Sequence, residues 1–212
     1  MRGKKYILFD NDGVLVETEA WYFRANVEIL NTMGITLEET RYREIMINGQ
    51  SAFLLAEEAG YDTETVEAAR SRRNDLYQHY LQTEEIAIPG VHEVLGALKE
   101  RYRMGIVTSA RREDFELIHT GRGIADAMEF VLCSGEYARA KPHPDPYLKG
   151  LELLGGTKHE AVVVEDSQRG LRSAVSAGIE CVIVDNAFTA QHDFSAATHR
   201  IGTIEALLGL LD

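Results

Sequence analysis

The chain has 212 residues, 45% of them hydrophobic and 26% charged, a composition typical of a globular protein that buries its own core. Its formal net charge of −12 argues against nucleic acid or an anionic membrane as a partner, but it leaves a small anionic substrate open, because a metal ion and local cations can reverse the field inside a cleft. The length fits one domain, or one domain with a sizeable insertion, and no apolar stretch is long enough to span a membrane.

The beginning of the chain and its cysteines favour a cytoplasmic protein. The basic residues 1–5 are followed by an apolar stretch over residues 6–9 only, which is too short for a signal peptide. Cys133 and Cys181 lack Cys-x-x-Cys spacing and each lies near a predicted strand, so we expect free, buried thiols in a reducing compartment. The oligomeric state stays open between a monomer and a small homo-oligomer.

The first predicted element is a buried strand over residues 6–9, which ends in the sequence Asp10-Asn11-Asp12-Gly13. Alone, this tetrapeptide is also typical of an ordinary turn. In an open α/β sheet, however, ligands bind just beyond the carboxyl ends of the strands. Two carboxylates packed there repel each other, and a divalent cation that prefers oxygen ligands, such as Mg²⁺, would compensate them.

A helical block follows directly after this first strand. Apolar spacing predicts helices around residues 23–30, 53–59 and 65–81, and there is no convincing strand between them. The pattern predicts a small α-helical domain over residues 17–83, inserted into an α/β core that is formed by residues 1–16 and 84–212.

The rest of the chain alternates helical patterns with short apolar runs. Helices are predicted over 91–98, 147–154 and 171–175, and strands over 104–107, 161–164 and 181–184, with a weaker candidate over 130–132. Asp145 suits an N-cap and Pro146 the first position of the helix that follows. Near-continuous apolar runs suit strands that are covered on both faces. We therefore predict an α/β fold with a doubly wound parallel sheet.

Further polar residues stand at the ends of these strands. Thr108 and Ser109 follow the second strand, and Glu165 and Asp166 follow the strand over residues 161–164. Lys141 lies in a proline-containing loop between them. Each has an ordinary interpretation, since hydroxyls and acids also begin helices and most lysines are solvated. Taken together with the first two aspartates, the acids could hold Mg²⁺ while the hydroxyl and the lysine supply donors for a phosphoryl group.

In this order the motifs resemble the haloacid dehalogenase-like superfamily, and more narrowly its branch of small phosphatases and β-phosphoglucomutase. The resemblance rests on residues 9–19 (Phe-Asp-Asn-Asp-Gly-Val-Leu-Val-Glu-Thr-Glu), on 107–109, on Lys141-Pro142, on 164–167 and on the long gap after the first motif. It implies a Rossmann-like core with an inserted helical cap, Mg²⁺ as the cofactor, and a small phosphorylated metabolite, above all a sugar phosphate, as the substrate.

The resemblance also assigns roles to residues. Asp10 is implied as the nucleophile that forms an aspartyl-phosphate, and Asp12 as the general acid and then the general base. In a strand that runs into a loop, residues two apart point the same way, so both could reach one phosphorus. Mg²⁺ would be held by the Asp10 carboxylate, the Asp12 carbonyl, Asp166, and Glu165 either directly or through water. Phosphoryl oxygens would be held by Thr108, Lys141 and backbone N–H groups near Asn11, Gly13 and Ser109.

In this branch the cap chooses the substrate, and the implied contacts in it are Tyr22, Gln50 and Arg73. Mutases of this kind carry a histidine in the hinge and an arginine in the cap loop, whereas this chain has Tyr22 and a residue of the 48–52 loop there. Hydrolysis is therefore favoured over the alternative, a β-phosphoglucomutase-like sugar-phosphate mutase. The acid at Asp12 likewise favours phosphoryl transfer over the carbon chemistry of the dehalogenases, which lack it.

Two other classes of protein fit part of the pattern. A phosphoacceptor signalling module also places acids, a Thr or Ser and a Lys around Mg²⁺ on a doubly wound sheet, and acts as a switch. A degenerate, non-catalytic binding protein would lack some of the catalytic positions. Asp12 and the helical insertion argue against the first, and the complete set of catalytic positions argues against the second.

Overall fold

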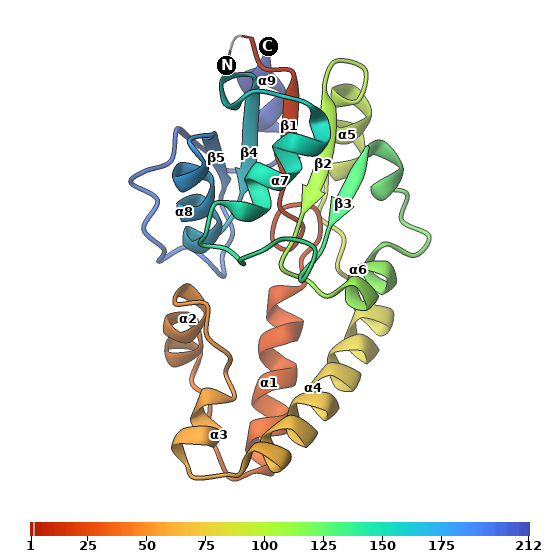
Figure 1. The fold of residues 1–212 in the computed structure, drawn as a ribbon. Coiled ribbons are helices and arrows are strands. Elements are labelled where there is room, and N and C mark those ends of the chain that lie inside the picture. Colours follow the sequence, from red (N-terminus) through yellow and green to blue (C-terminus); the bar gives the residue numbers. More distant parts are fainter. Residues whose placement is uncertain (2) are drawn as a thin grey trace. The chain divides into compact units, whose positions relative to one another are not determined.

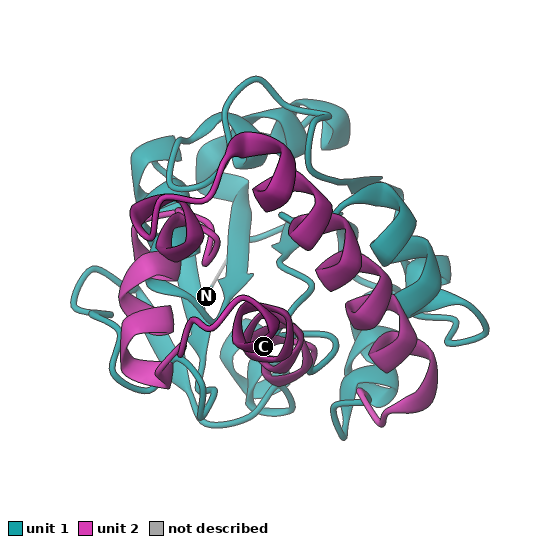
Figure 2. Ribbon diagram, turned by 90° about the horizontal axis from the view of Figure 1, so that it is seen from below, with its two compact units in different colours: residues 1–17, 87–212 teal, residues 18–86 magenta. Residues whose placement is uncertain are grey.

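The structure is a computed structural model that describes residue 1 and residues 3–212. The chain forms two compact units, which Figure 2 distinguishes by colour. Unit 1 contains Met1–Glu17 and Ala87–Asp212, and unit 2 contains Thr18–Ile86. Among the described residues, no helix combines the length and the apolar character that crossing a membrane requires.

Unit 1 contains a six-stranded parallel sheet in the order β3-β2-β1-β4-β5-β6 (Figure 1). Its strands are β1 (Tyr6–Phe9), β2 (Arg103–Val107), β3 (Phe130–Leu132), β4 (Ala161–Glu165), β5 (Glu180–Val184) and β6 (His199–Ile201). In the register of the central strand, Leu8 lies opposite Gly105 of β2 and Val163 of β4. The strand order reverses at β1, and ligands of such sheets bind at this switch point, beyond the carboxyl ends of the strands.

Helices cover both faces of the sheet, as the apolar runs predict. They are α5 (Val91–Leu98), α6 (Arg112–His119), α7 (Asp145–Leu154), α8 (Gln168–Ala177) and α9 (Ala206–Leu211). On one face, Leu8 and Val163 belong to a core with Tyr147 of α7 and Leu171 of α8. Their neighbours along the strands, such as Phe9, point to the other face and are buried too. The predicted doubly wound parallel sheet is confirmed.

The structure differs from the sequence-based expectation at several elements. The helix α6 and the last two elements, β6 and α9, were not anticipated, because they are short and, in β6, partly polar and exposed. Asp145 does not cap α7 but lies in its first turn, where its carboxylate accepts from Nε and a terminal nitrogen of Arg139, both at 2.9 Å. The strand β4 extends one residue further than predicted, to Glu165, whose side chain is fully buried.

Unit 2 is entirely helical among its assigned elements. It contains α1 (Glu19–Thr32), α2 (Glu39–Ile47), α3 (Leu54–Glu58) and α4 (Thr63–Thr83). The two long helices, α1 and α4, pack against each other. Asp62 caps α4 by accepting from the Thr65 amide at 2.8 Å, which satisfies one of the free N–H groups at the helix start.

The insertion begins and ends at one place in unit 1. Val16, at the end of the loop after β1, pairs with Ala87 in an isolated antiparallel bridge. The residues between them form unit 2, apart from Glu17. Both connections to the inserted segment are therefore held together by unit 1 itself.

Candidate active site

The acids that follow β1 and β4 lie at one edge of the sheet because the two strands are parallel neighbours. The sheet ladder continues into the site, since the Asp10 amide donates to the Val164 carbonyl at 2.9 Å. The Thr108 amide, after β2, donates to the Leu132 carbonyl of β3 at 2.9 Å. Asp10 and Thr108 are therefore placed by strand pairing rather than by a free loop.

Lys141 connects the two acidic strand ends. Its Nζ donates to Asp10 Oδ1 at 2.9 Å, to Glu165 Oε1 at 2.7 Å and to the Val107 carbonyl at 3.0 Å. These contacts use all three N–H groups of the ammonium. The Lys141 side chain is only 2% exposed, and its Nζ lies 4.7 Å from the centroid of the Tyr147 ring. One buried cation is thus shared by two carboxylates.

This sharing perturbs the proton affinities of the cluster. Burial and the neighbouring Glu165 raise the pKa of Asp10 to about 7, although Lys141 opposes the shift. Burial also opposes ionisation of Lys141 and Glu165, but the attraction of Lys141 to Asp10 and to Glu165 outweighs it. The pKa of Lys141 therefore lies above its ordinary value, and the pKa of Glu165 lies below its own. The acids exceed the available positive charge, and a further cation would correct the imbalance.

The donor set fits a hard divalent cation. Asp10, Glu165 and Asp166 are buried, and each offers a carboxylate oxygen within 4.8 Å of the others. Oxygen donors of this kind suit Mg²⁺. Gly13 preserves the space beside them, because it has a φ of +77° and a Cβ there would lie 2.1 Å from Asp166 Oδ2. The residues present are therefore compatible with the metal that the sequence predicts.

Glu165 is held by several hydrogen bonds. In addition to Lys141, its Oε1 accepts from the Tyr147 hydroxyl at 2.7 Å. Its Oε2 accepts from the Asp166 and Ser167 amides, both at 3.1 Å, and from the Ser167 hydroxyl at 2.9 Å. These donors hold the Glu165 carboxylate in one orientation, where it in turn positions Lys141.

Thr108 and Asp12 meet on the other side of the cluster. The Thr108 hydroxyl donates to Asp12 Oδ2 at 3.2 Å and accepts from the Ala110 amide at 2.9 Å. Ser109, beside it, has a buried hydroxyl oxygen without a hydrogen-bond partner among the described residues. A hydroxyl that is bonded to one acid and a second that is buried and unpaired provide donors for an anion near Asp12.

The two remaining residues of the predicted phosphate-binding set are placed differently. The Gly13 N–H donates to the Val16 carbonyl at 2.7 Å, so in this structure it is engaged within its own loop. The side chain of Asn11 is fully buried, and its Oδ1 lies 2.7 Å from Nε2 of His119. A contact of Asn11 with phosphate would therefore have to come from its main chain.

The three predicted cap residues all belong to unit 2. Arg73 is buried and donates to Asn26 Oδ1 at 2.9 Å and to Asn74 Oδ1 at 3.0 Å. Its guanidinium carbon lies 4.4 Å from the centroid of the Tyr22 ring. Gln50 is exposed, just after α2. The structure thus brings Tyr22 and Arg73 together within unit 2, where Arg73 holds two helices through neutral partners.

Sequence reasoning missed three side chains around the site. Tyr147 bonds Glu165, His119 bonds Asn11, and the Tyr137 hydroxyl donates to the Thr108 carbonyl at 2.9 Å. They come from α7, from the end of α6 and from the loop before Lys141. A signal was present only for Tyr147, which lies on the apolar stripe of a predicted helix that packs on the sheet.

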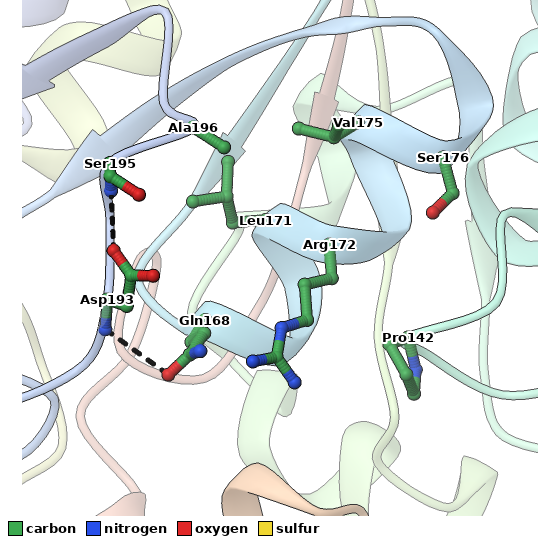
Figure 3. A pocket seen from close by; sticks show the side chains of 9 residues that line it. All are labelled: Pro142, Gln168, Leu171, Arg172, Val175, Ser176, Asp193, Ser195 and Ala196. Carbon is green, nitrogen blue, oxygen red and sulfur yellow. Dashed lines mark hydrogen bonds between the residues drawn. The ribbon is translucent and has the colours of Figure 1, made fainter.

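A cavity of about 360 Å³ lies elsewhere in unit 1, beside α8 (Figure 3). It is lined by Pro142, Gln168, Leu171, Arg172, Val175, Ser176, Asp193, Ser195 and Ala196. Gln168 Oε1 accepts from the Asp193 amide at 3.2 Å, which fixes one wall. None of these nine residues belongs to the acidic cluster, so the candidate active site is the cluster at the strand ends and not this cavity.

Several known proteins have similar sequences or the same fold. The chain is 32% identical to hexitol phosphatase A from Escherichia coli, over 85% of this chain and 83% of that protein. It is 29% identical to a phosphorylated carbohydrates phosphatase from Thermotoga maritima, over 82% of each. The crystal structure of a CbbY variant from Rhodobacter sphaeroides with xylulose-(1,5)-bisphosphate has the same fold, with a TM-score of 0.83, 23% identity and 99% coverage of both chains.

The family itself is established by a match to a family model over most of the chain. Residues 7–184 match the model of the haloacid dehalogenase-like hydrolase family, a range that includes Lys141 and the acids of its cluster. As its motifs predict, the chain belongs to the haloacid dehalogenase-like hydrolases.

Proposed function

We propose that this phosphoric monoester hydrolase is a Mg²⁺-dependent phosphatase that acts on a small phosphorylated metabolite, a sugar or sugar-alcohol phosphate, through an aspartyl-phosphate at Asp10. One observation carries the proposal. Lys141 is buried between Asp10 and Glu165, within a cluster that has more acids than cations, at the strand ends where α/β sheets bind ligands. Such a cluster can accept a metal ion and a phosphoryl group together.

In the first half of the reaction, the Asp10 carboxylate attacks phosphorus and the bond between phosphorus and the ester oxygen breaks. The leaving oxygen takes the proton of the Asp12 carboxyl and departs as the alcohol. In the second half, the Asp12 carboxylate takes a proton from water as the water oxygen attacks phosphorus. The bond between phosphorus and Asp10 then breaks and inorganic phosphate is released. Asp10 is again a carboxylate and Asp12 again carries its proton.

Mg²⁺, when bound by Asp10, Asp166, Glu165 and the Asp12 carbonyl, would supply electrostatic compensation between the carboxylate nucleophile and the phosphate. Lys141 supplies a fixed positive charge beside Asp10, at 2.9 Å. Thr108 bonds Asp12 at 3.2 Å and can exchange this contact for a phosphoryl oxygen. Preorganised donors of this kind lower the barrier because they need no rearrangement during the reaction.

The substrate class is supported by the relatives rather than by the core of the site. Two relatives that share most of the length of this chain are named as phosphatases of hexitols and of phosphorylated carbohydrates. Family membership and Asp12 favour turnover over the switch of a phosphoacceptor module. A mutase would instead return the phosphoryl group to the sugar, and it is the alternative to hydrolysis.

The test is phosphate release from a panel of hexitol phosphates, hexose phosphates, phosphoserine and a nucleoside monophosphate. We expect release from the carbohydrate esters, its loss on chelation, and its recovery with Mg²⁺. Glucose 1-phosphate distinguishes the alternatives, because a mutase would isomerise it faster than it releases phosphate. Activity that survives chelation would remove the metal from the scheme, and preference for phosphoserine would remove the carbohydrate.

A further inference from the structure

Asn11 stands between the two aspartates of the proposed active site, but its side chain lies outside their cluster. It is fully buried, with Oδ1 at 2.7 Å from Nε2 of His119. Its side-chain oxygen thus contacts the end of α6, whereas the carboxylates of Asp10 and Asp12 contact Lys141 and Thr108. The side chain of Asn11 therefore connects the loop of Asp10 and Asp12 to α6.

The main chain of Asn11 is also the fixed point of this loop. Its carbonyl accepts from the amides of Leu15 at 2.8 Å and of Val16 at 3.2 Å. The Gly13 N–H closes the turn by donating to the Val16 carbonyl at 2.7 Å. With the carbonyl and the side chain of Asn11 both held, the peptide units on either side of it, which carry the two aspartates, have little freedom to rotate.

His119 is the partner that fixes the Asn11 side chain. It is the last residue of α6 and is buried, with its ring centroid 4.2 Å from that of Phe115. Burial, and secondarily Arg122, lowers the pKa of His119 to about 4, so the imidazole is neutral near pH 7 and has one N–H. An amide oxygen can only accept, which places this N–H at Nε2.

Packing alone does not account for this polar pair. Asn11 Nδ2 and His119 Nδ1 are buried without a hydrogen-bond partner among the described residues, which costs free energy that two apolar side chains would not. The hydrogen bond of the pair instead fixes the orientation of the Asn11 side chain. It also ties α6, the helix that follows the Thr108 loop, to the loop after β1, so that the two loops that meet at the Thr108–Asp12 bond are held together at a second point.

We propose that His119 is a positioning residue, which keeps the Asp10–Asp12 loop in its reactive geometry through its hydrogen bond to Asn11. This inference rests on the phosphatase function proposed above. It assigns to α6 a role in the reaction, although no atom of His119 reaches the substrate.

The test compares two replacements of His119 in the full-length enzyme with Mg²⁺. His119→Phe keeps an aromatic ring against Phe115 but removes the N–H, whereas His119→Gln keeps a donor near the position of Nε2. Because small misplacements of a reacting group are costly, we expect His119→Phe to lower kcat by about 10- to 100-fold and to change KM by less than about 3-fold. His119→Gln should recover most of kcat.

Thr120→Ala is the matched control, because Thr120 is the exposed next residue and its hydroxyl donates to the Glu116 carbonyl of α6 at 2.7 Å. It should leave kcat and KM unchanged. A folded His119→Phe enzyme with wild-type kcat would overturn the proposal, and so would a Gln variant as impaired as the Phe variant. A wild-type enzyme that releases no phosphate would instead refute the function on which the inference rests.

Nitrogen-15 spectra of labelled histidine provide a second measurement should His119→Phe fail to fold. The His119 signal is the one absent from His119→Gln. Protonation at Nε2 near neutral pH is the expected result. Protonation at Nδ1 would place the donor on the wrong side of the ring and contradict the assigned bond.

Discussion

Lys141 in unit 1 and Arg73 in unit 2 are both buried cations, but they are compensated in opposite ways. Lys141 is shared by two carboxylates and a carbonyl. Arg73 donates to the neutral amides of Asn26 and Asn74 and lies over the rings of Tyr22 and Phe53. The first cluster leaves carboxylates with unsatisfied charge, while the second satisfies its cation with dipoles and aromatic faces.

The contrast separates the candidate active site from a cluster that joins two helices. In the Lys141 cluster burial, and after it the neighbouring Glu165, raises the pKa of Asp10 to about 7, so its charge can change when an ion or a substrate arrives. In the Arg73 cluster both hydrogen-bond partners are neutral, and the guanidinium serves to join α1 to α4. A buried charge alone is thus no sign of chemistry, whereas a charge balanced among competing ionisable groups is.

The largest effect should come from Asp10, the proposed nucleophile. Asp10→Asn keeps the shape of the side chain but removes the attacking charge, and we expect phosphate release to fall by about 10³-fold or more. Circular dichroism should show an unchanged fold. Asp126→Asn, at an exposed acid of unit 1, is the control and should retain full activity. Appreciable turnover by Asp10→Asn would refute its role.

Removal of the two buried cations should have unequal effects on stability. Lys141→Met leaves two buried carboxylates without their cation, and the free energy of unfolding should fall by about 3–5 kcal/mol. Arg73→Met loses only bonds to neutral groups, and we expect a loss of about 1–3 kcal/mol. Denaturant unfolding measures both. An equal or larger loss for Arg73→Met would remove the distinction, and a raised KM in folded Arg73→Lys would assign Arg73 to substrate binding.

The pKa of Asp10 makes the stability of the metal-free protein depend on pH. An acid whose pKa is raised on folding stabilises the folded state fully below its unfolded value of 3.8, and this contribution is lost as the pH rises through about 7. The Tm of the chelated protein should therefore fall relative to that of Asp10→Asn as the pH rises, and Mg²⁺ should reverse the decline. Parallel Tm profiles for the two proteins would contradict the raised pKa.

The smallest effect should come from the removal of one buried tyrosine hydroxyl in each unit. Tyr147 donates to Glu165 at 2.7 Å, and Tyr42 donates to Glu19 at 2.8 Å. Replacement of either by Phe should lower the free energy of unfolding by about 1.5–3 kcal/mol, as expected for a bond to a charged group. Only Tyr147→Phe should also lower kcat, because Glu165 positions Lys141. An equal fall in kcat for Tyr42→Phe would place unit 2 in the same network.

Much of unit 1 could be predicted because its strands are uniformly apolar. The runs at β1 and β3 have the predicted bounds, and β2, β4 and β5 differ from prediction by one residue each. The helix α2 was not recognised, since only Tyr42 and Ile45 of its nine residues are buried and the rest are mostly charged. For β6 the reason is similar, because a three-residue edge strand that reads His-Arg-Ile leaves almost no pattern.

The candidate site likewise has a part that the sequence predicts and a part that it does not. The proximity of Asp10, Glu165 and Asp166 follows from parallel strands whose ends carry acids, and this pattern is visible in the sequence. The contacts of His119 and Tyr147 depend on how far each helix is rotated about its axis against the sheet. That rotation is set by packing across the whole core, and no local spacing encodes it.

The bridge between Val16 and Ala87 has an evolutionary consequence. Unit 1 brings Val16 and Ala87 together without help from the segment between them. That segment can therefore be exchanged while the proposed active site in unit 1 stays intact. Chimeras that carry the 18–86 segment of a relative would then inherit the donor's preference among phosphate esters and the recipient's chemistry. Recombination at this one position in the fold would then change the range of substrates in a lineage of related enzymes.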